Sequence, residues 1–319
     1  MKRRSLMKAA ALMAAMGIAA PAVAQEAEKK IIGVSIPSAT HGFMGGLNWH
    51  AQDTIKRLGA AYPNLEFVLS TAGDPAKQVN DIEDMMATRN IDALVVLPFE
   101  SEPLTAPVKA VKDAGKFVTV VDRGLSQEGI EDLYVAGDNT AFGRVAGEYF
   151  KENLEPGAKV VVLRGIPTTL DNERVDAFRA ALEGSEVEIL DMQHGNWNRD
   201  DAFAVMQDYL AKYPQIDAVW AADDDMAIGV LEAISAANRQ DEMWVIGGAG
   251  MKEIVKRIMD GDKQLPVNVT YPPALISSAI EMTALNFVSN APMTGRFIIS
   301  SQLITPENAE QFYYPDSPF

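Results

Sequence analysis

Short, almost continuously apolar runs that alternate with amphipathic helical windows constrain the fold of this chain more than any other feature. In the first half the predicted strands span residues 31–36, 67–70, 93–97 and 117–121, and the helices between them span 45–61, 75–89 and 102–114. Strands that are apolar on both faces are typical of a sheet covered on both sides. Helices between such strands predict βαβ units, and therefore an α/β fold with parallel sheets.

The same alternation recurs in the second half. The predicted strands span residues 160–163, 187–190, 218–221 and 244–246, and the helices span 138–154, 171–184, 199–213 and 224–238. Asp138 is a suitable N-cap for the first of these helices. Residues 91–95 (IDALV) and 216–220 (IDAVW) open the third strand of each set. This echo at matched positions predicts two related, doubly wound lobes.

The N-terminal segment has the layout of an export signal. Four basic residues stand among the first eight, an apolar run covers residues 9–20, and Pro-Ala-Val-Ala follows at 21–24. This charged, apolar and small-residue order predicts a cleavable signal peptide over residues 1–24. The apolar run is too short for a permanent membrane span. Arg3 and Arg4 also fit a twin-arginine signal. We therefore expect a protein that works outside the cytosol.

Charge and cysteine content exclude several classes of function. All 44 Asp and Glu residues lie outside this leader, so the rest of the chain is more acidic than the net charge of −16 for the whole. Such acidity argues against nucleic-acid and anionic-membrane partners, and it favours a neutral or cationic ligand. The chain has no cysteine, which excludes disulfides and a cysteine-linked lipid anchor. Its length favours two domains.

Motifs for cofactors, metals and nucleophilic catalysis are missing from the sequence. There is no Walker phosphate loop, no G-x-S-x-G elbow and no dinucleotide fingerprint, and the three histidines have no recognised metal spacing. Asp223–Asp225 has two interpretations: a hard-metal site, or carboxylates that favour a helix start, which we prefer. The sequence does not exclude a catalytic pair of carboxylates, but nothing in it selects one. We expect no cofactor, no metal and no enzyme activity.

Polar and aromatic residues follow the predicted strands in both halves. They occupy residues 38–43, 122–123, 137–139, 168–174, 196–198 and 223–225. Open parallel sheets bind ligands beyond the carboxyl ends of their strands. We therefore expect these segments to meet in one ligand-binding cleft.

Three motifs in this order and spacing carry a family resemblance: residues 118–123 (VTVVDR), 135–139 (VAGDN) and 224–229 (DDMAIG). With them, the chain from about residue 31 to 303 resembles the ribose-type (type I) periplasmic sugar-binding proteins of ABC transporters. The resemblance implies two doubly wound lobes joined by three hinge crossings, near Gly137, Tyr271 and Ile299. The implied lobes comprise residues 25–137 with 272–299, and residues 138–271 with 300–319. It also implies a permease partner in the inner membrane, and we expect a monomer.

The resemblance implies a ligand site as well. Its members are His41, Phe43, Met44, Asp122, Arg123, Asn139, Arg174, Trp197, Asp223 and Tyr271. Phe43 and Trp197 match aromatic residues on opposite faces of the sugar ring. Asp122 and Arg123 match the pair that grips ring hydroxyls. Arg174 matches the arginine of the second lobe if one residue is deleted from the preceding loop. Aromatic faces suit the C–H face of a sugar, and charged forks satisfy its hydroxyls.

This chain departs from the ribose pattern at several of these positions. His41 and Asp223 stand where the pattern has Asn, and Met44 replaces a second aromatic residue. Ala249 replaces an Asp, and Tyr271 replaces a Gln. Because unmatched hydroxyls are costly to bury, these changes predict that ribose is not the preferred ligand.

We therefore expect a soluble periplasmic receptor for a monosaccharide or sugar alcohol. Two alternatives remain open from the sequence. One is an exported carbohydrate-acting enzyme on the same scaffold, which product formation would reveal. The other is a sugar sensor that signals to a chemoreceptor or membrane kinase.

Overall fold

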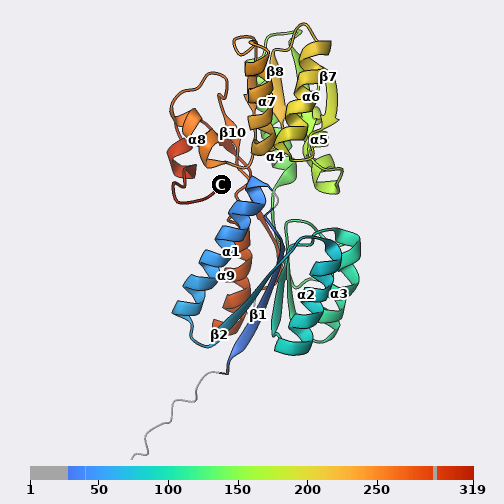
Figure 1. Cartoon of the computed structure of the whole chain (residues 1–319), viewed down its shortest axis with the longest axis vertical. Helices are drawn as coiled ribbons and strands as arrows, with labels where there is room; N and C mark the ends of the chain where they lie inside the picture. The colour runs from blue at the N-terminus through green and yellow to red at the C-terminus, as the bar shows by residue number, and fades with distance from the viewer. Residues whose placement is uncertain (1–27, 40, 290–292) are drawn as a thin grey trace, which may run out of the picture.

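The computed structural model describes residues 28–39, 41–289 and 293–319, and it shows two α/β lobes stacked end to end (Figure 1). The predicted signal peptide lies outside the described residues. Among the helices of the described chain, none combines the length and the apolar character that a bilayer crossing needs.

The first lobe is built on a six-stranded parallel sheet. Its strands, in spatial order, are β11 (Gly295–Ile299), β5 (Leu133–Gly137), β4 (Phe117–Val121), β3 (Ala93–Val96), β1 (Lys30–Pro37) and β2 (Leu65–Ala72). Helices α1 (Gly42–Ala61) and α9 (Leu275–Val288) pack together on one face, and α2 (Pro75–Asp84) and α3 (Ser101–Asp113) on the other (Figure 1). The strand order reverses between β1 and β3, which makes the edge beyond their carboxyl ends the expected place for a ligand.

The second lobe repeats this plan on a smaller scale. Its parallel sheet has the order β7 (Glu188–His194), β6 (Lys159–Arg164), β8 (Ala218–Ala221) and β9 (Trp244–Ile246). Helices α4 (Asn139–Asn153) and α5 (Thr169–Ala181) form one pair, and α6 (Arg199–Lys212) and α7 (Asp224–Ala236) form the other. Helix α8 (Lys252–Met259), the antiparallel strands β10 (Asn268–Val269) and β12 (Leu303–Ile304), and the 3₁₀ turn η2 (Ala309–Phe312) complete it.

The repeated IDA sequence performs the same task in both lobes. The Asp92 carboxylate accepts a hydrogen bond from the backbone N–H of Ile31 at 2.9 Å. In the second lobe, the Asp217 carboxylate accepts one from the N–H of Lys159 at 2.6 Å. Each aspartate therefore ties the start of the lobe's first strand to the strand beside it. The predicted relationship between the two halves is confirmed at the level of individual contacts.

Most predicted elements appear within a few residues of their expected ends. Phe117–Val121, Ala218–Ala221 and Trp244–Ile246 match the prediction at both ends. Asp138 caps α4, because its carboxylate accepts from the N–H of Ala141 at 2.7 Å. The helix predicted over residues 75–89 is wrong at its end, where Met85–Arg89 forms a π-helical turn. Strand β5 and the elements after β9 were not predicted one by one, because several are very short.

The chain passes between the two sheets three times. It leaves the first sheet after β5, returns between β10 and α9, and leaves again after β11. We propose that the lobe boundaries fall at these passages, near Gly137, Tyr271 and Ile299. The last residues belong to the second lobe by η2, which packs against α8. Phe319 nevertheless reaches across to the first lobe, where its ring lies 6.0 Å from that of Phe43.

Candidate functional site

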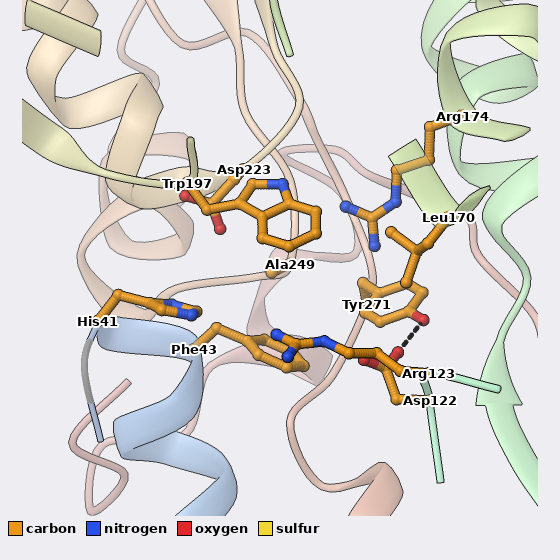
Figure 2. A pocket seen from close by; sticks show the side chains of 10 residues that line it. All are labelled: His41, Phe43, Asp122, Arg123, Leu170, Arg174, Trp197, Asp223, Ala249 and Tyr271. Atoms are coloured by element: carbon orange, nitrogen blue, oxygen red, sulfur yellow. Dashed lines mark hydrogen bonds between the residues drawn. The ribbon is translucent and has the colours of Figure 1, made fainter. Parts of the chain in front are cut away.

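The strand ends of both lobes face one small inner cavity (Figure 2). Its lining consists of His41, Phe43, Asp122, Arg123, Leu170, Arg174, Trp197, Asp223, Ala249 and Tyr271. The enclosed space is about 30 Å³, which is enough for little more than a water molecule. A larger outer cavity of about 490 Å³ adjoins it and shares Asp122, Arg123, Leu170 and Trp197 with it. The two cavities are therefore parts of one cleft, and the inner part is almost closed.

Nine of the ten predicted site residues border this cleft. Asn139 lines the outer cavity instead of the inner one. Met44 was predicted as a ligand contact, but it lines neither cavity and is 2% exposed within the apolar core. Because α1 begins at Gly42, earlier than expected, Met44 turns onto its buried face. Leu170 is a lining residue that sequence reasoning missed, since a lone leucine at a helix start carries no signal of its own.

Asp122 and Arg123 lie directly beyond the carboxyl end of β4. The Asp122 carboxylate accepts a hydrogen bond of 2.5 Å from the Tyr271 hydroxyl. The Asp122 carbonyl oxygen accepts one of 2.6 Å from the Tyr134 hydroxyl. Arg123 donates from Nη1 to the Phe99 carbonyl oxygen at 2.7 Å. Each charged group therefore has one protein partner, which orients it toward the cavity as Figure 2 shows.

Burial has the largest effect on the pKa of Tyr271, whose hydroxyl donates to Asp122. It raises the pKa of Tyr271 well above its usual value of 10.0, and the Asp122 charge raises it further. The Tyr271 hydroxyl therefore keeps its proton at neutral pH and acts as a hydrogen-bond donor to Asp122. As a consequence, one oxygen of Asp122 is committed to the protein before any ligand arrives.

Arg174 is held in place by two aromatic rings. Its guanidinium carbon lies 4.1 Å from the centre of the Phe142 ring and 4.4 Å from that of Tyr271. Nε donates to the Asn139 side-chain oxygen at 2.9 Å, and Nη1 donates to the Ala222 carbonyl at 3.2 Å. The Arg174 guanidinium therefore points into the cavity in a fixed orientation (Figure 2). Because the side chain is already ordered, ligand binding does not have to overcome its loss of side-chain entropy.

Two aromatic faces oppose each other across the cavity. Trp197 comes from the loop after β7 in the second lobe, and Phe43 comes from the first turn of α1 in the first lobe (Figure 2). The Trp197 indole packs so closely on Gly165 that a Cβ there would overlap it. Gly165 in turn donates its N–H to the buried Asp171 carboxylate at 2.8 Å. This support fixes the distance of the Trp197 indole from the Phe43 ring.

The His41 ring extends the flat surface that the Phe43 ring presents to the cavity. The two rings are nearly parallel, with centres 6.4 Å apart. Burial lowers the pKa of His41 below its usual value of 6.5, and the nearby Arg123 charge acts in the same direction, while Asp225 opposes both. His41 is therefore neutral at pH 7. Its Nδ1 is buried and has no hydrogen-bond partner among the residues that the structure describes, so it remains available to a ligand.

Asp223 and Asp224, the first two of three consecutive aspartates, have separate roles. Asp223 caps α7 by accepting from the Met226 N–H at 3.1 Å, and it lines the cavity. Burial and the charges of Asp225 and Asp224 raise the pKa of Asp223 well above 3.8. Asp224 faces away and accepts from the backbone N–H groups of Gly248, Gly250 and Met251. Within the described chain, no three acidic, histidine or cysteine side chains gather in a way that would hold a metal ion.

Backbone strain in the described residues concentrates at this cleft. Six residues other than glycine have a positive φ, and three of them are asparagines, which tolerate it. The other three are Asp122 (59°), Trp197 (54°) and Ala249 (108°), and all three line the inner cavity. Such conformations cost roughly 1–3 kcal/mol each and persist where the surroundings enforce them, often at functional sites. The strain therefore marks the cleft independently of its side chains.

Comparison with known proteins agrees with this geometry. A family model described as "Periplasmic binding protein domain" matches residues 32–288. The chain is 30% identical over 258 residues to the ribose import binding protein RbsB of Salmonella typhimurium, covering 81% of this chain and 85% of that protein.

Two solved structures share the fold and more than a quarter of their residues with this chain. An ABC transporter solute binding protein from Mycobacterium smegmatis with bound glycerol is 28% identical, has a TM-score of 0.80, and matches over 91% of this chain and 98% of its own. The Caulobacter myo-inositol binding protein, bound to myo-inositol, is 26% identical with a TM-score of 0.78, over 88% and 95% of the two chains. The two-lobed fold, the site at the strand ends and the match over residues 32–288 together show that this chain belongs to the periplasmic binding protein family.

Proposed function

We propose that this chain is an exported solute-binding protein that takes up a monosaccharide or sugar alcohol between its lobes and delivers it to an ABC permease. The inner cavity is the observation that carries this proposal. It sets the Phe43 ring of one lobe against the Trp197 ring of the other, with charged groups from both lobes around the rim. Flat rings bury the C–H face of a sugar, and carboxylates and guanidinium forks satisfy its hydroxyls.

Closure of the lobes explains how such a site would work. The inner space of about 30 Å³ is too small for a sugar, so the lobes must separate to admit one. A ligand that touches both lobes favours the closed arrangement, because it gains contacts there that the open arrangement lacks. The closed, loaded form is the species that a permease would recognise. We expect it to act as a monomer in the periplasm, after removal of residues 1–24, and to catalyse no reaction.

The departures from the ribose pattern narrow the ligand. Ala249 offers a methyl group where the pattern has a carboxylate, and Tyr271 occupies one oxygen of Asp122. Both changes leave fewer acceptors for hydroxyl groups than the ribose site has. The two related solved structures, which hold glycerol and myo-inositol, support the class of polyols. We therefore propose a sugar alcohol, a cyclitol or a monosaccharide other than ribose.

A thermal-shift screen against sugars and polyols tests this proposal. A ligand at about 100 times its Kd stabilises the folded state by about 2.7 kcal/mol, which is a readily measured shift. Asp122→Ala and Arg123→Ala should each weaken binding of the best compound at least tenfold. Arg144→Ala is the matched control, because Arg144 is an exposed arginine that pairs with Glu148 on the surface of α4.

Two outcomes would contradict the proposal. One is unchanged affinity in both site variants, which would remove the assignment of Asp122 and Arg123. The other is conversion of the bound sugar into a product, which would favour the carbohydrate-acting enzyme instead. Tighter binding of ribose than of every other pentose, hexose and polyol would overturn the narrower statement about the ligand.

A further inference from the structure

The first turn of α1 is held by the second lobe through a hydrogen bond. The backbone N–H of Gly42 donates to the Asp225 carboxylate at 2.8 Å, and Asp225 stands in the first turn of α7. A Cβ at Gly42 would lie 2.6 Å from that carboxylate oxygen, so the contact depends on glycine. An anion at a helix N-terminus is favourable because the N–H groups there carry partial positive charge. Here the carboxylate and the helix belong to different lobes.

A second cross-lobe contact lies close to the first. Lys252 on α8 donates to the carbonyl oxygens of Ser317 at 2.6 Å and Pro315 at 3.2 Å. These hydrogen bonds tie residues 315–317 to the second lobe. Phe319 then reaches α1, where its ring meets that of Phe43 edge-on at 6.0 Å. Figure 1 shows this end of the chain between α8 and the upper end of α1. Phe319 is 4% exposed, so the contact is well buried.

Both contacts converge on the part of the first lobe that carries ligand-facing groups. His41 and Phe43 line the inner cavity, and they flank Gly42 in the sequence. Neither Asp225 nor Phe319 lines that cavity. Asp225 and Phe319 therefore act on the ligand without touching it, through the position of the α1 turn and, for Asp225, also through its charge near His41 and Asp223.

We propose that Asp225 and Phe319 form a cross-lobe latch that positions His41 and Phe43 and populates the closed arrangement before the ligand binds. The apparent Kd of a site equals its intrinsic Kd divided by the fraction of molecules in the competent state. A latch that raises this fraction tightens binding without touching the ligand. The effect on affinity rests on the proposed function, whereas the latch itself can be measured without any ligand.

The absence of cysteine from the sequence makes a distance measurement straightforward. Spin labels at Lys56→Cys on α1 and Ala211→Cys on α6 report the separation of the lobes, since both positions are exposed. In the unliganded protein we expect a short-distance population that shrinks in favour of longer distances in Asp225→Ala and in Phe319→Ala. Asp74→Ala is the matched control: Asp74 accepts from the Lys77 N–H at the start of α2, wholly within the first lobe. It should leave the distances unchanged.

Calorimetry with myo-inositol provides the second readout. Loss of one hydrogen bond to a charged group should weaken its binding about tenfold in Asp225→Ala, and less in Asp225→Asn, which keeps an acceptor oxygen. Distance distributions identical to wild type in both alanine variants would overturn the latch. Shifted distances with unchanged affinity would overturn the positioning role. Failure of the wild-type protein to bind any sugar or polyol would count against the proposed function, while the distances would still decide the latch.

Discussion

The hydrogen bond between Tyr271 and Asp122 is the most informative single contact to perturb, because it joins the hinge to the ligand-facing acid of the first lobe. Tyr271→Phe removes the hydroxyl that lies 2.5 Å from the carboxylate and keeps the ring. The ring's other contacts, with the Arg174 guanidinium at 4.4 Å and with Phe142 edge-on at 6.0 Å, are available to phenylalanine too. The substitution therefore isolates one hydrogen bond.

The magnitude follows from the charge and burial of the two partners. Asp122 is 7% exposed and Tyr271 is 3% exposed, so water replaces the lost donor poorly. A hydrogen bond to a charged group contributes about 1.5–3 kcal/mol, and we expect a loss of stability of that size. With an unfolding entropy of about 2.1 cal/mol/K per residue, this loss corresponds to a decrease in Tm of roughly 2–5 °C for a chain of this length.

A double-mutant cycle separates this contact from other effects of the substitutions. Tyr271→Phe, Asp122→Asn and the double variant would be unfolded in urea, with circular dichroism as the probe. We expect a coupling energy of about 1.5–3 kcal/mol between the two sites. A coupling below about 0.5 kcal/mol, which is the usual additivity error, would refute the reasoning. The liganded protein should lose less stability, because a ligand hydroxyl can replace the missing donor to Asp122.

Three further predictions concern residues of the same cleft. The pKa of Asp223 is raised well above 3.8 in the folded protein, so over a range of pH above about 4 the folded state keeps this proton while the unfolded chain loses it. Asp223 therefore makes the free energy of unfolding fall as pH rises above about 4. Asp223→Asn keeps an oxygen for the cap and should gain Tm relative to wild type from pH 4 to pH 8, whereas a constant difference would contradict this. Ala249→Gly should raise the free energy of unfolding by about 1 kcal/mol in urea titrations, since glycine adopts a φ of 108° without strain; a loss of stability would count against strain at this position. Gly165→Ala should displace the Trp197 indole, change its fluorescence and weaken ligand binding at least tenfold. Retained affinity would show that contact with Gly165 does not fix the position of the indole.

Several site residues were predictable because their position in the chain fixes their position in space. Asp122 and Arg123 follow a strand that is buried on both faces, and the carboxyl end of such a strand is where α/β folds place ligands. The same argument located Asp223 after β8 and His41 after β1. The strand-end argument also located the segment 196–198 with Trp197, and the family resemblance added Tyr271.

The surroundings of other residues could not be predicted from the linear pattern. Arg174 stands in a helical window where a solvated surface residue is the ordinary expectation, yet it is 6% exposed between two aromatic rings. Met44 was wrong as a ligand contact because the start of α1 differed by three residues, which is almost one helical turn. The contacts that Asp225 and Phe319 make with α1 join residues that are more than 180 positions apart in the chain.

By itself, the sequence determined the class of fold and the repetition of its two lobes. Period and apolar content are local properties, and the IDA echo preserves the same strand-to-strand contact in both halves. Only the tertiary structure decided which polar groups remain available to a ligand. The Tyr271 hydroxyl on Asp122 and the Asp225 carboxylate at α1 both act across the boundary between the lobes. Their partners are chosen by how the lobes meet, and no local pattern of residues encodes that arrangement.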